Sequence, residues 1–193
     1  MAEQLASQSA PLRFFTYGPA ARLHADEHQQ LEASLRRIVA GKAGGQLHVA
    51  VVGPIYGGSL PIARYVVRAL GELGHRVTWI DHSVHYASYE AFGSFREERY
   101  RLTVQSRFAD VLSFSTIAKI AEDPPDLVLA IAQAPLTLAV LQHLRKKKFT
   151  TAMWFVENYR HLTYWRQLAG GYDYWFVIQQ AECIEALKRA GAT

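Results

Sequence analysis

The chain alternates short apolar runs with longer segments whose apolar residues recur every three or four positions. Three of the apolar runs, 47–52, 127–132 and 150–156, have the length of buried strands. Segments with helical spacing come between them, and a parallel pair of strands needs such a crossover connection. The pattern therefore predicts an α/β fold in which helices cover both faces of a parallel sheet. Because crossovers are right-handed, we expect the doubly wound, Rossmann-like arrangement.

We expect a sheet of five or more strands with the first strand central. In chain order, strands are predicted at 47–52, 76–81, 127–132, 150–156 and 173–178, and helices at 59–73, 95–121, 136–147, 162–168 and 181–189. Asp123, Pro124 and Pro125 end the long second helix, because proline lacks an N–H and restricts the residue before it. A loop with Tyr86 and Tyr89 is predicted between the second strand and that helix.

A length of 193 residues is usual for one domain. We divide the chain into an extension at 1–45, with a helix predicted at 28–39, and a Rossmann-like domain at 46–193. No apolar stretch is long enough to span a bilayer, and the first residues do not form a secretory signal. We therefore expect a soluble, cytoplasmic protein. The lone cysteine, Cys183, cannot form an internal disulfide or a zinc site, and we expect it to be a packed side chain.

The charge balance argues against a nucleic-acid partner. The chain has 21 Lys and Arg residues and 17 Asp and Glu residues, a net charge of +4. The densest basic run, 145–148, lies at the end of a predicted helix, where cations complement the helix dipole, and no aromatic residue interrupts it. The histidines lack metal-ligand spacing, so no metal site is expected. The aromatic residues at 159–175 are interpreted as core packing rather than as a carbohydrate platform.

The first predicted strand ends in a glycine-bearing turn at 53–58, directly before a helix. Gly57 and Gly58 have no Cβ and let a ligand approach the backbone, and Ser59 suits the N-cap position. Free N–H groups in the first turn of a helix attract phosphate or carboxylate groups, so we expect these three residues to bind substrate. The alternative is a plain turn that binds nothing. The glycine spacing differs from that of dinucleotide and triphosphate loops, which disfavours NAD-dependent enzymes and ATPases.

A second polar loop follows the predicted strand at 150–156. It carries Glu157, Asn158 and Arg160 at the carboxyl end of the strand, where parallel sheets bind their ligands. A carboxylate, an amide and a guanidinium suit hydroxyl groups and anions, so these residues are predicted to bind substrate. The alternative is an ion pair between Glu157 and Arg160 that closes a turn. Asp81, after the second strand, is either a ribose ligand or the cap of the next turn.

Several enzyme and regulator classes lack their signatures. The sequence has no Gly-x-Ser-x-Gly motif and no Cys–His nucleophile pattern, so hydrolysis by a catalytic triad is disfavoured. The paired acidic residues of a receiver-type regulator are missing after the first strand.

Four segments, taken in their order and spacing, resemble a known family. They are Val51–Ser59, Leu70–Val77, Trp154–Arg160 and Tyr172–Phe176. Over about residues 46–193, the chain resembles the N-terminal half of CgeB-like glycosyltransferases, bacterial proteins related to the spore maturation protein CgeB. The strongest parts of the resemblance are the Gly-Gly turn and the Trp-Phe-x-Glu turn.

The resemblance implies the N-terminal, acceptor-side domain of a GT-B glycosyltransferase that uses a nucleotide-sugar as co-substrate and needs no other cofactor. In that picture Gly57, Gly58 and Ser59 face the donor diphosphate, and Glu157, Asn158 and Arg160 line the cleft. The acceptor and the catalytic base are not assigned. The C-terminal, donor-binding domain is expected to lie outside this chain, so the chain alone is expected to be inactive. The alternative is a non-catalytic Rossmann-like module that binds a small anionic ligand or a protein partner.

Overall fold

The computed structural model describes residue 33 and residues 45–192. The chain divides into two compact units, Met1–Leu47 and His48–Thr193, and each is considered by itself. In the first unit, Ala33 is helical and exposed. The rest of the predicted helix at 28–39 lies outside the described residues, as does almost all of the predicted extension.

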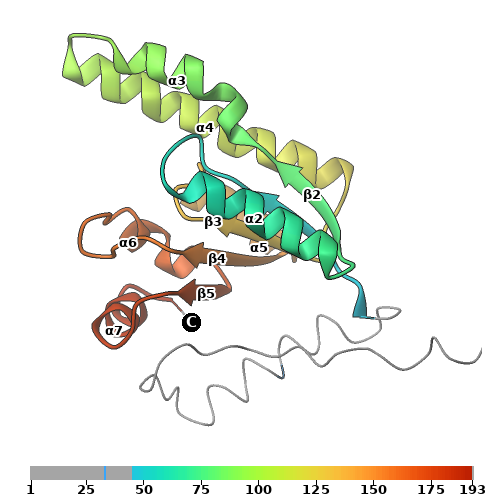
Figure 1. Ribbon diagram of the computed structural model, residues 1–193. Helices are drawn as coiled ribbons and strands as arrows, with labels where there is room; N and C mark the ends of the chain where they lie inside the picture. Colours follow the sequence, from blue (N-terminus) through green and yellow to red (C-terminus); the bar gives the residue numbers. More distant parts are fainter. Residues whose placement is uncertain (1–32, 34–44, 193) are drawn as a thin grey trace, which may run out of the picture. The chain divides into compact units, whose positions relative to one another are not determined.

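The second unit is built on a wholly parallel sheet, which has five strands within residues 45–192 (Figure 1). The strands are β1 (His48–Val52), β2 (Arg76–Ile80), β3 (Leu127–Ile131), β4 (Thr150–Phe155) and β5 (Tyr174–Val177). Their order is β2-β1-β3-β4-β5. This confirms the predicted α/β fold with a parallel sheet. β1 lies between β2 and β3 and not at an edge, but the central position that we predicted for it belongs to β3.

Six helices connect or follow these strands within the described part of the chain. They are α2 (Ser59–Glu72), α3 (Tyr86–Gly93), α4 (Glu98–Glu122), α5 (Leu138–Lys146), α6 (Trp165–Leu168) and α7 (Glu182–Arg189). The prediction of a loop around Tyr86 and Tyr89 was wrong, because α3 forms there. α3 packs against α4 and has no buried residue, so its sequence lacks the apolar stripe by which helices are recognised.

Apolar side chains fill both faces of the sheet. Alternate residues of a strand point to opposite faces, and all five residues of β1 are buried. One face packs against α4 and α5 in a cluster that includes Ala50, Val52, Ile120, Val128, Ala130, Leu141 and Leu144. α2 lies on the other face, where it contacts β1, β2 and β3 (Figure 1). Helices therefore cover both faces, as the doubly wound arrangement requires.

The amino ends of β1 and β2 are joined to the end of α4 by a polar cluster. The backbone N–H of His48 donates to Asp126 Oδ2 at 2.8 Å, and its ring nitrogens contact Pro124 O at 3.0 Å and Thr78 Oγ1 at 2.8 Å. The Arg76 guanidinium donates two hydrogen bonds to the Asp123 carboxylate, at 2.7 and 3.1 Å. The hydrogen-bonding groups of this cluster pair with one another, so the cluster stabilises this end of the sheet.

At the carboxyl end of β2, Asp81 caps a 3₁₀ turn, His82–His85. Asp81 Oδ1 accepts hydrogen bonds from the Ser83 N–H at 2.9 Å and from the Ser83 hydroxyl at 2.6 Å. The cap alternative for Asp81 is therefore confirmed.

The next residue, His82, is buried against α4. Its Nε2 lies 3.0 Å from Thr116 Oγ1, whose hydroxyl donates to the carbonyl of Leu112. Because the Thr116 hydroxyl proton is already donated to Leu112, Thr116 Oγ1 can only accept from His82, which therefore donates through Nε2. The pKa of His82 is lowered to about 4, chiefly by burial, with smaller lowering by the positive fields of His85 and Lys119 and an opposing effect of the Asp81 carboxylate.

The C-terminal aromatic residues pack inside the domain, as predicted. Trp165 and Tyr172 are buried, and the indole of Trp175 donates to the carbonyl of Ala169 at 3.0 Å. Cys183 is also buried, which confirms its interpretation as a packed side chain. Among the helices of the described residues, none combines the length and the apolar character needed to cross a bilayer.

Candidate functional site

The carboxyl ends of β1, β3 and β4 meet at one edge of the sheet. The chain leaves β1 toward β2 on one side and returns to β3 on the other, so the strand order reverses between β1 and β3. In parallel sheets, ligands bind at the carboxyl ends of the strands near such a reversal. The loops that follow these three strands are 53–58, 132–137 and 156–164, and they hold most of the predicted site.

Two predicted site residues, Ser59 and Glu157, contact each other. The Ser59 hydroxyl donates a hydrogen bond to the carboxylate of Glu157, which is half-buried. The predicted N-cap role of Ser59 was wrong, because Gly58 takes the N-cap position and Ser59 is the first residue of α2. The contact brings the loop after β4 against the positive end of the α2 dipole. The chain's own carboxylate therefore lies next to the position where an anion was expected.

Asn158 and Arg160 lie apart from this pair. Arg160 forms an ion pair with Glu182 of α7, and its Nε donates to the Tyr159 hydroxyl at 3.1 Å. Asn158 Oδ1 accepts a hydrogen bond from the Arg160 N–H at 2.9 Å, which makes a local turn. The alternative of an ion pair between Glu157 and Arg160 was wrong, because each residue has another partner. Asn158 and Arg160 are exposed and lie toward α7.

The electrostatics of this second group follow from its contacts. Hydrogen bonds to Tyr159 and Glu182 raise the pKa of the Arg160 guanidinium, and the bond from Arg160 holds the pKa of the Glu182 carboxyl below its ordinary value. Arg160 therefore stays charged and paired, and its cation is directed at Glu182 rather than at the edge above β1 and β3.

Gln133 was missed by the sequence analysis and lies beside Gly57. It follows β3 with a φ of 68°, and its backbone N–H donates to the Tyr164 hydroxyl at 2.7 Å. A Cβ at Gly57 would lie 2.3 Å from Gln133 Oε1, so the end of the Gln133 side chain would have to move, and the φ of 98° at Gly57 itself favours glycine. Gln133 Oε1 is shielded from solvent and accepts no hydrogen bond from a described residue. Buried oxygens of this kind normally have a partner, so this atom is a candidate ligand contact.

Tyr164 connects the loops after β3 and β4. Burial of its hydroxyl raises its pKa to about 12, the bond from the Gln133 backbone opposes this shift, and the nearby Glu157 carboxylate adds to it. The phenol is therefore neutral at physiological pH. Because its oxygen accepts the bond from Gln133, its proton can be donated elsewhere at the edge.

The groups at this edge suit hydroxyls better than phosphates. They comprise the Glu157 carboxylate, the Gln133 amide oxygen, the Tyr164 hydroxyl and the open backbone at Gly57. Ser59 is fully buried, and its hydroxyl serves to hold Glu157. None of these described groups is a cation, and a second carboxylate or a phosphate would be repelled by Glu157. Hydrogen-bond acceptors in excess of donors favour a ligand with many O–H groups. Among the described residues, no three His, Cys, Asp or Glu side chains are arranged to hold a metal ion.

Comparison with known proteins gave no match for this chain. No protein-family model matches it, and no match is found among curated proteins or among solved structures. The resemblance to CgeB-like glycosyltransferases thus stays a prediction that rests on the four sequence segments.

The two neighbouring glycines of the turn should respond differently to alanine. Gly57→Ala is expected to lower the free energy of unfolding by about 2 kcal/mol, because Gly57 has a φ of 98° and the new Cβ would clash with Gln133. Gly58 has a φ of −65° and open space at its Cβ position, so Gly58→Ala should cost less than about 1 kcal/mol. Urea unfolding of both variants, followed by circular dichroism, measures the difference. Equal losses would show that the turn adapts at both positions.

Proposed function

We propose that this domain is the acceptor-side, Rossmann-like half of a sugar-nucleotide-dependent glycosyltransferase. The observation that carries the proposal is the convergence of three loops where the strand order reverses. There the turn at Gly57 meets the Gln133 oxygen, which has no partner among the described residues, and Glu157 is held by Ser59. Reversal points are the usual ligand sites of doubly wound sheets, and these groups are suited to sugar hydroxyls.

In such a transfer, an acceptor oxygen bonds to the anomeric carbon of the donor sugar. The bond from that carbon to the diphosphate oxygen breaks, and the acceptor proton passes to a base. Glu157 supplies a carboxylate at this edge for that proton, and the Ser59 hydrogen bond fixes its position. The developing charge on the diphosphate needs cations, which the described groups of the edge do not offer. The proposal assigns that task to a second, donor-binding domain.

The other candidate, a non-catalytic module for a small anionic ligand, has less support. An anion at the start of α2 would meet the half-buried Glu157 carboxylate. Arg160, which could attract an anion, is paired with Glu182 instead. The ligand chemistry of the edge therefore favours a sugar.

Nucleotide-sugar binding tests the proposal. ¹⁵N-labelled full chain would be titrated with UDP-glucose, GDP-mannose and dTDP-glucose, and with the free nucleoside diphosphates. Because the diphosphate contacts are assigned to the second domain, we expect weak binding of the nucleotide-sugars through their sugar hydroxyls, with amide shifts at Gly57, Ser59, Gln133 and Glu157. The free nucleoside diphosphates should cause no such shifts. Gly58→Val should abolish the shifts caused by the nucleotide-sugars because its side chain blocks the backbone approach, while the Tm stays nearly unchanged because a Cβ there meets no other atom.

Gly71→Val is the matched control. Gly71 lies near the end of α2, and its Cβ position is also open, so this variant carries the same substitution away from the edge. It should bind like the wild type. Absence of shifts with every nucleotide-sugar at millimolar concentration, or binding by Gly58→Val at wild-type affinity, would overturn the proposal.

A further inference from the structure

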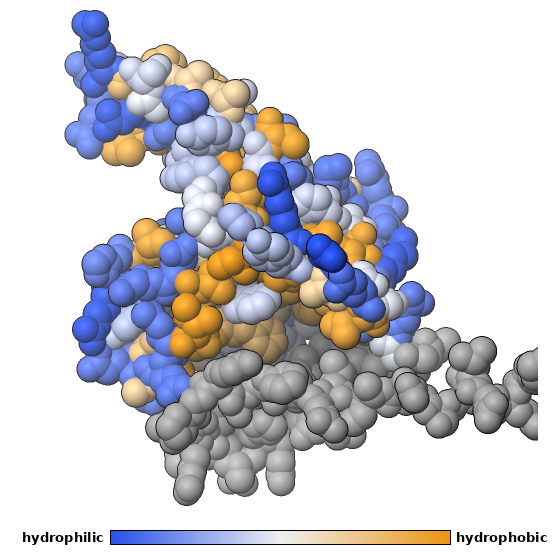
Figure 2. Space-filling view, in the orientation of Figure 1, coloured by the Kyte–Doolittle hydropathy of each residue, from blue (hydrophilic) through white to orange (hydrophobic). Residues whose placement is uncertain are grey.

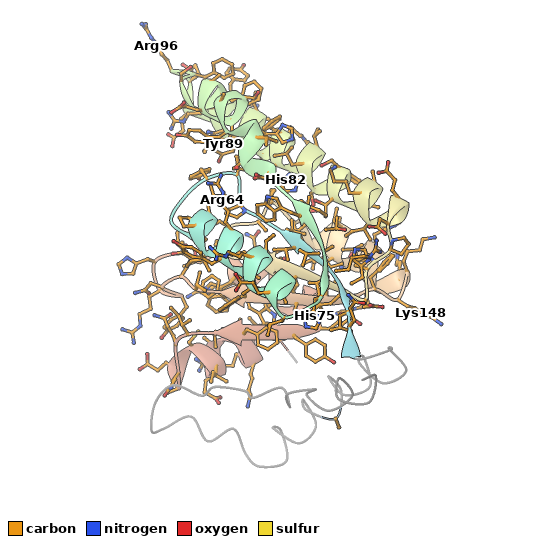
Figure 3. The ribbon with its side chains drawn as sticks, turned by 45° about the vertical axis from the view of Figure 1, so that its right-hand side comes forward. Arg64, His75, His82, Tyr89, Arg96 and Lys148 are labelled. Carbon is orange, nitrogen blue, oxygen red and sulfur yellow. The ribbon has the colours of Figure 1, made fainter. Side chains whose placement is uncertain are left out.

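A separate pocket lies beside this edge, between the turn that precedes α2 and the pair of helices α3 and α4. Figure 2 shows the surface hollowed below these two helices, and Figure 3 shows Tyr89 of α3 close to the turn. The pocket has a volume of about 400 Å³, within the usual range for small-molecule sites. It is lined by Tyr56, Tyr86, Tyr89, Glu90, Gly93, Ser94 and Gln105.

Three tyrosine rings form the apolar part of the pocket. Tyr56 stacks on Tyr89 with ring centroids 5.2 Å apart and an angle of 29° between the planes. The Tyr86 ring lies 6.1 Å from that of Tyr56. Tyr56 is 46% exposed and Tyr86 is 42% exposed, so flat aromatic surface faces the solvent in a concave site. Clustered, exposed aromatic surface of this kind is typical of a binding site.

The polar groups of the pocket are mainly acceptors. Glu90 accepts one hydrogen bond from the Tyr86 hydroxyl at 2.9 Å, and a carboxylate can accept several more. The Ser94 hydroxyl donates to Ala91 O at 2.7 Å, which leaves its oxygen as an acceptor. Gln105 adds an amide, and Glu90 is the only charged residue among those described as lining the pocket. A ligand that fits brings O–H donors and no negative charge.

We propose that this pocket binds the ring of a neutral saccharide. The C–H face of a pyranose ring packs on the exposed tyrosine faces, and its hydroxyls donate to Glu90 and Gln105. Phosphates and carboxylates are repelled by Glu90. A quaternary ammonium ion needs several ring faces turned toward it, whereas Tyr56 and Tyr89 stack on each other.

The place of the pocket suggests what the saccharide does. Tyr56 immediately precedes Gly57 in the turn, so a sugar in the pocket lies next to the edge at Gly57 and Ser59. Its role as the acceptor rests on the proposed function. The binding of a saccharide does not, because it follows from the lining of the pocket alone.

Saturation-transfer NMR on the full chain tests the inference with methyl glucosides, methyl galactosides and maltose as probes. Tyr86→Ala, which removes a ring, and Glu90→Gln, which keeps the shape but removes the charge, should each weaken binding about tenfold. Tyr65→Ala is the matched control, because Tyr65 is 71% exposed on α2 and does not line the pocket. It should bind like the wild type.

The outcomes separate this inference from the proposed function. Saccharide binding should fall about tenfold in Tyr86→Ala and stay unchanged in Tyr65→Ala, and failure of the nucleotide-sugar titration alone would remove only the acceptor role. The inference is overturned if none of the saccharides binds, or if both pocket variants bind them at wild-type affinity. It is equally overturned if uridine or choline, rather than a saccharide, shows the dependence on Tyr86 and Glu90.

Discussion

Replacing Trp165 with alanine should lower the free energy of unfolding by about 3–5 kcal/mol, the largest stability effect expected here. The ring is only 2% exposed and belongs to the core cluster. Its Nε1–H donates to the carbonyl of Tyr159 at 2.8 Å, so it also anchors the loop that carries Glu157. Urea unfolding followed by far-UV circular dichroism measures the loss. Amide exchange at Glu157 should become faster, because the loop loses its anchor.

Trp165→Phe separates the two contributions of this residue. Phenylalanine keeps most of the apolar ring but cannot donate to Tyr159, so the loss should be about 1–2 kcal/mol. A loss below 1 kcal/mol in Trp165→Ala would contradict the prediction, since it would mean that neighbouring side chains refill the space.

The stability of the domain should fall as the pH is lowered from about 6.5 to 4, and His82 should cause a large part of the fall. Above pH 6.5, this imidazole is neutral in both the folded and the unfolded chain. Between these values the unfolded chain binds a proton that the folded protein does not, because burial lowers the folded pKa to about 4. This difference in proton binding at His82 lowers the free energy of unfolding by about 3 kcal/mol. The loss levels off below pH 4, where the folded protein binds the proton as well.

Urea unfolding at several pH values checks this linkage. His82→Gln keeps a neutral donor near Thr116 and should flatten the profile between pH 6.5 and 4. His161→Gln is the matched control and should keep the wild-type profile, because the His161 side chain is exposed in the folded protein. A profile for His82→Gln as steep as that of the wild type would assign the acid sensitivity to other groups.

The strands were the most predictable part of the fold. β3 is apolar along its whole length and β1 is apolar after His48, because both sheet faces are covered, and such runs stand out in a sequence. α3 was not predictable, since it packs on α4 with no buried residue of its own. The sheet order could not be fixed either, because apolar runs specify that strands pair but not which strands are neighbours.

The positions of most site residues could be predicted from the sequence, but the residues that they contact could not. The glycine turn and the polar loop after β4 were identified from residue types at strand ends. The contact between Ser59 and Glu157 joins residues 98 positions apart, and no local pattern encodes it. Gln133 gave no signal, because its positive φ results from the turn after β3 and not from its residue type. Arg160 was predicted to bind substrate, but it forms an ion pair with Glu182 instead. This contact could not be predicted, because it depends on where α7 begins.

The strand order also constrains how the domain can assemble. β1 lies between β2 and β3, yet 78 positions separate His48 from its partner Asp126 at the start of the β1–β3 pair. A growing chain can form β1, α2 and β2 early, but β1 keeps an open side until β3 has been synthesised. Folding slows as contacts become more distant in sequence, so we expect the docking of β1 on β3 to limit the folding rate. The Ser59–Glu157 contact needs β4 as well, so the ligand edge is completed late and is absent from any fragment that ends before that strand.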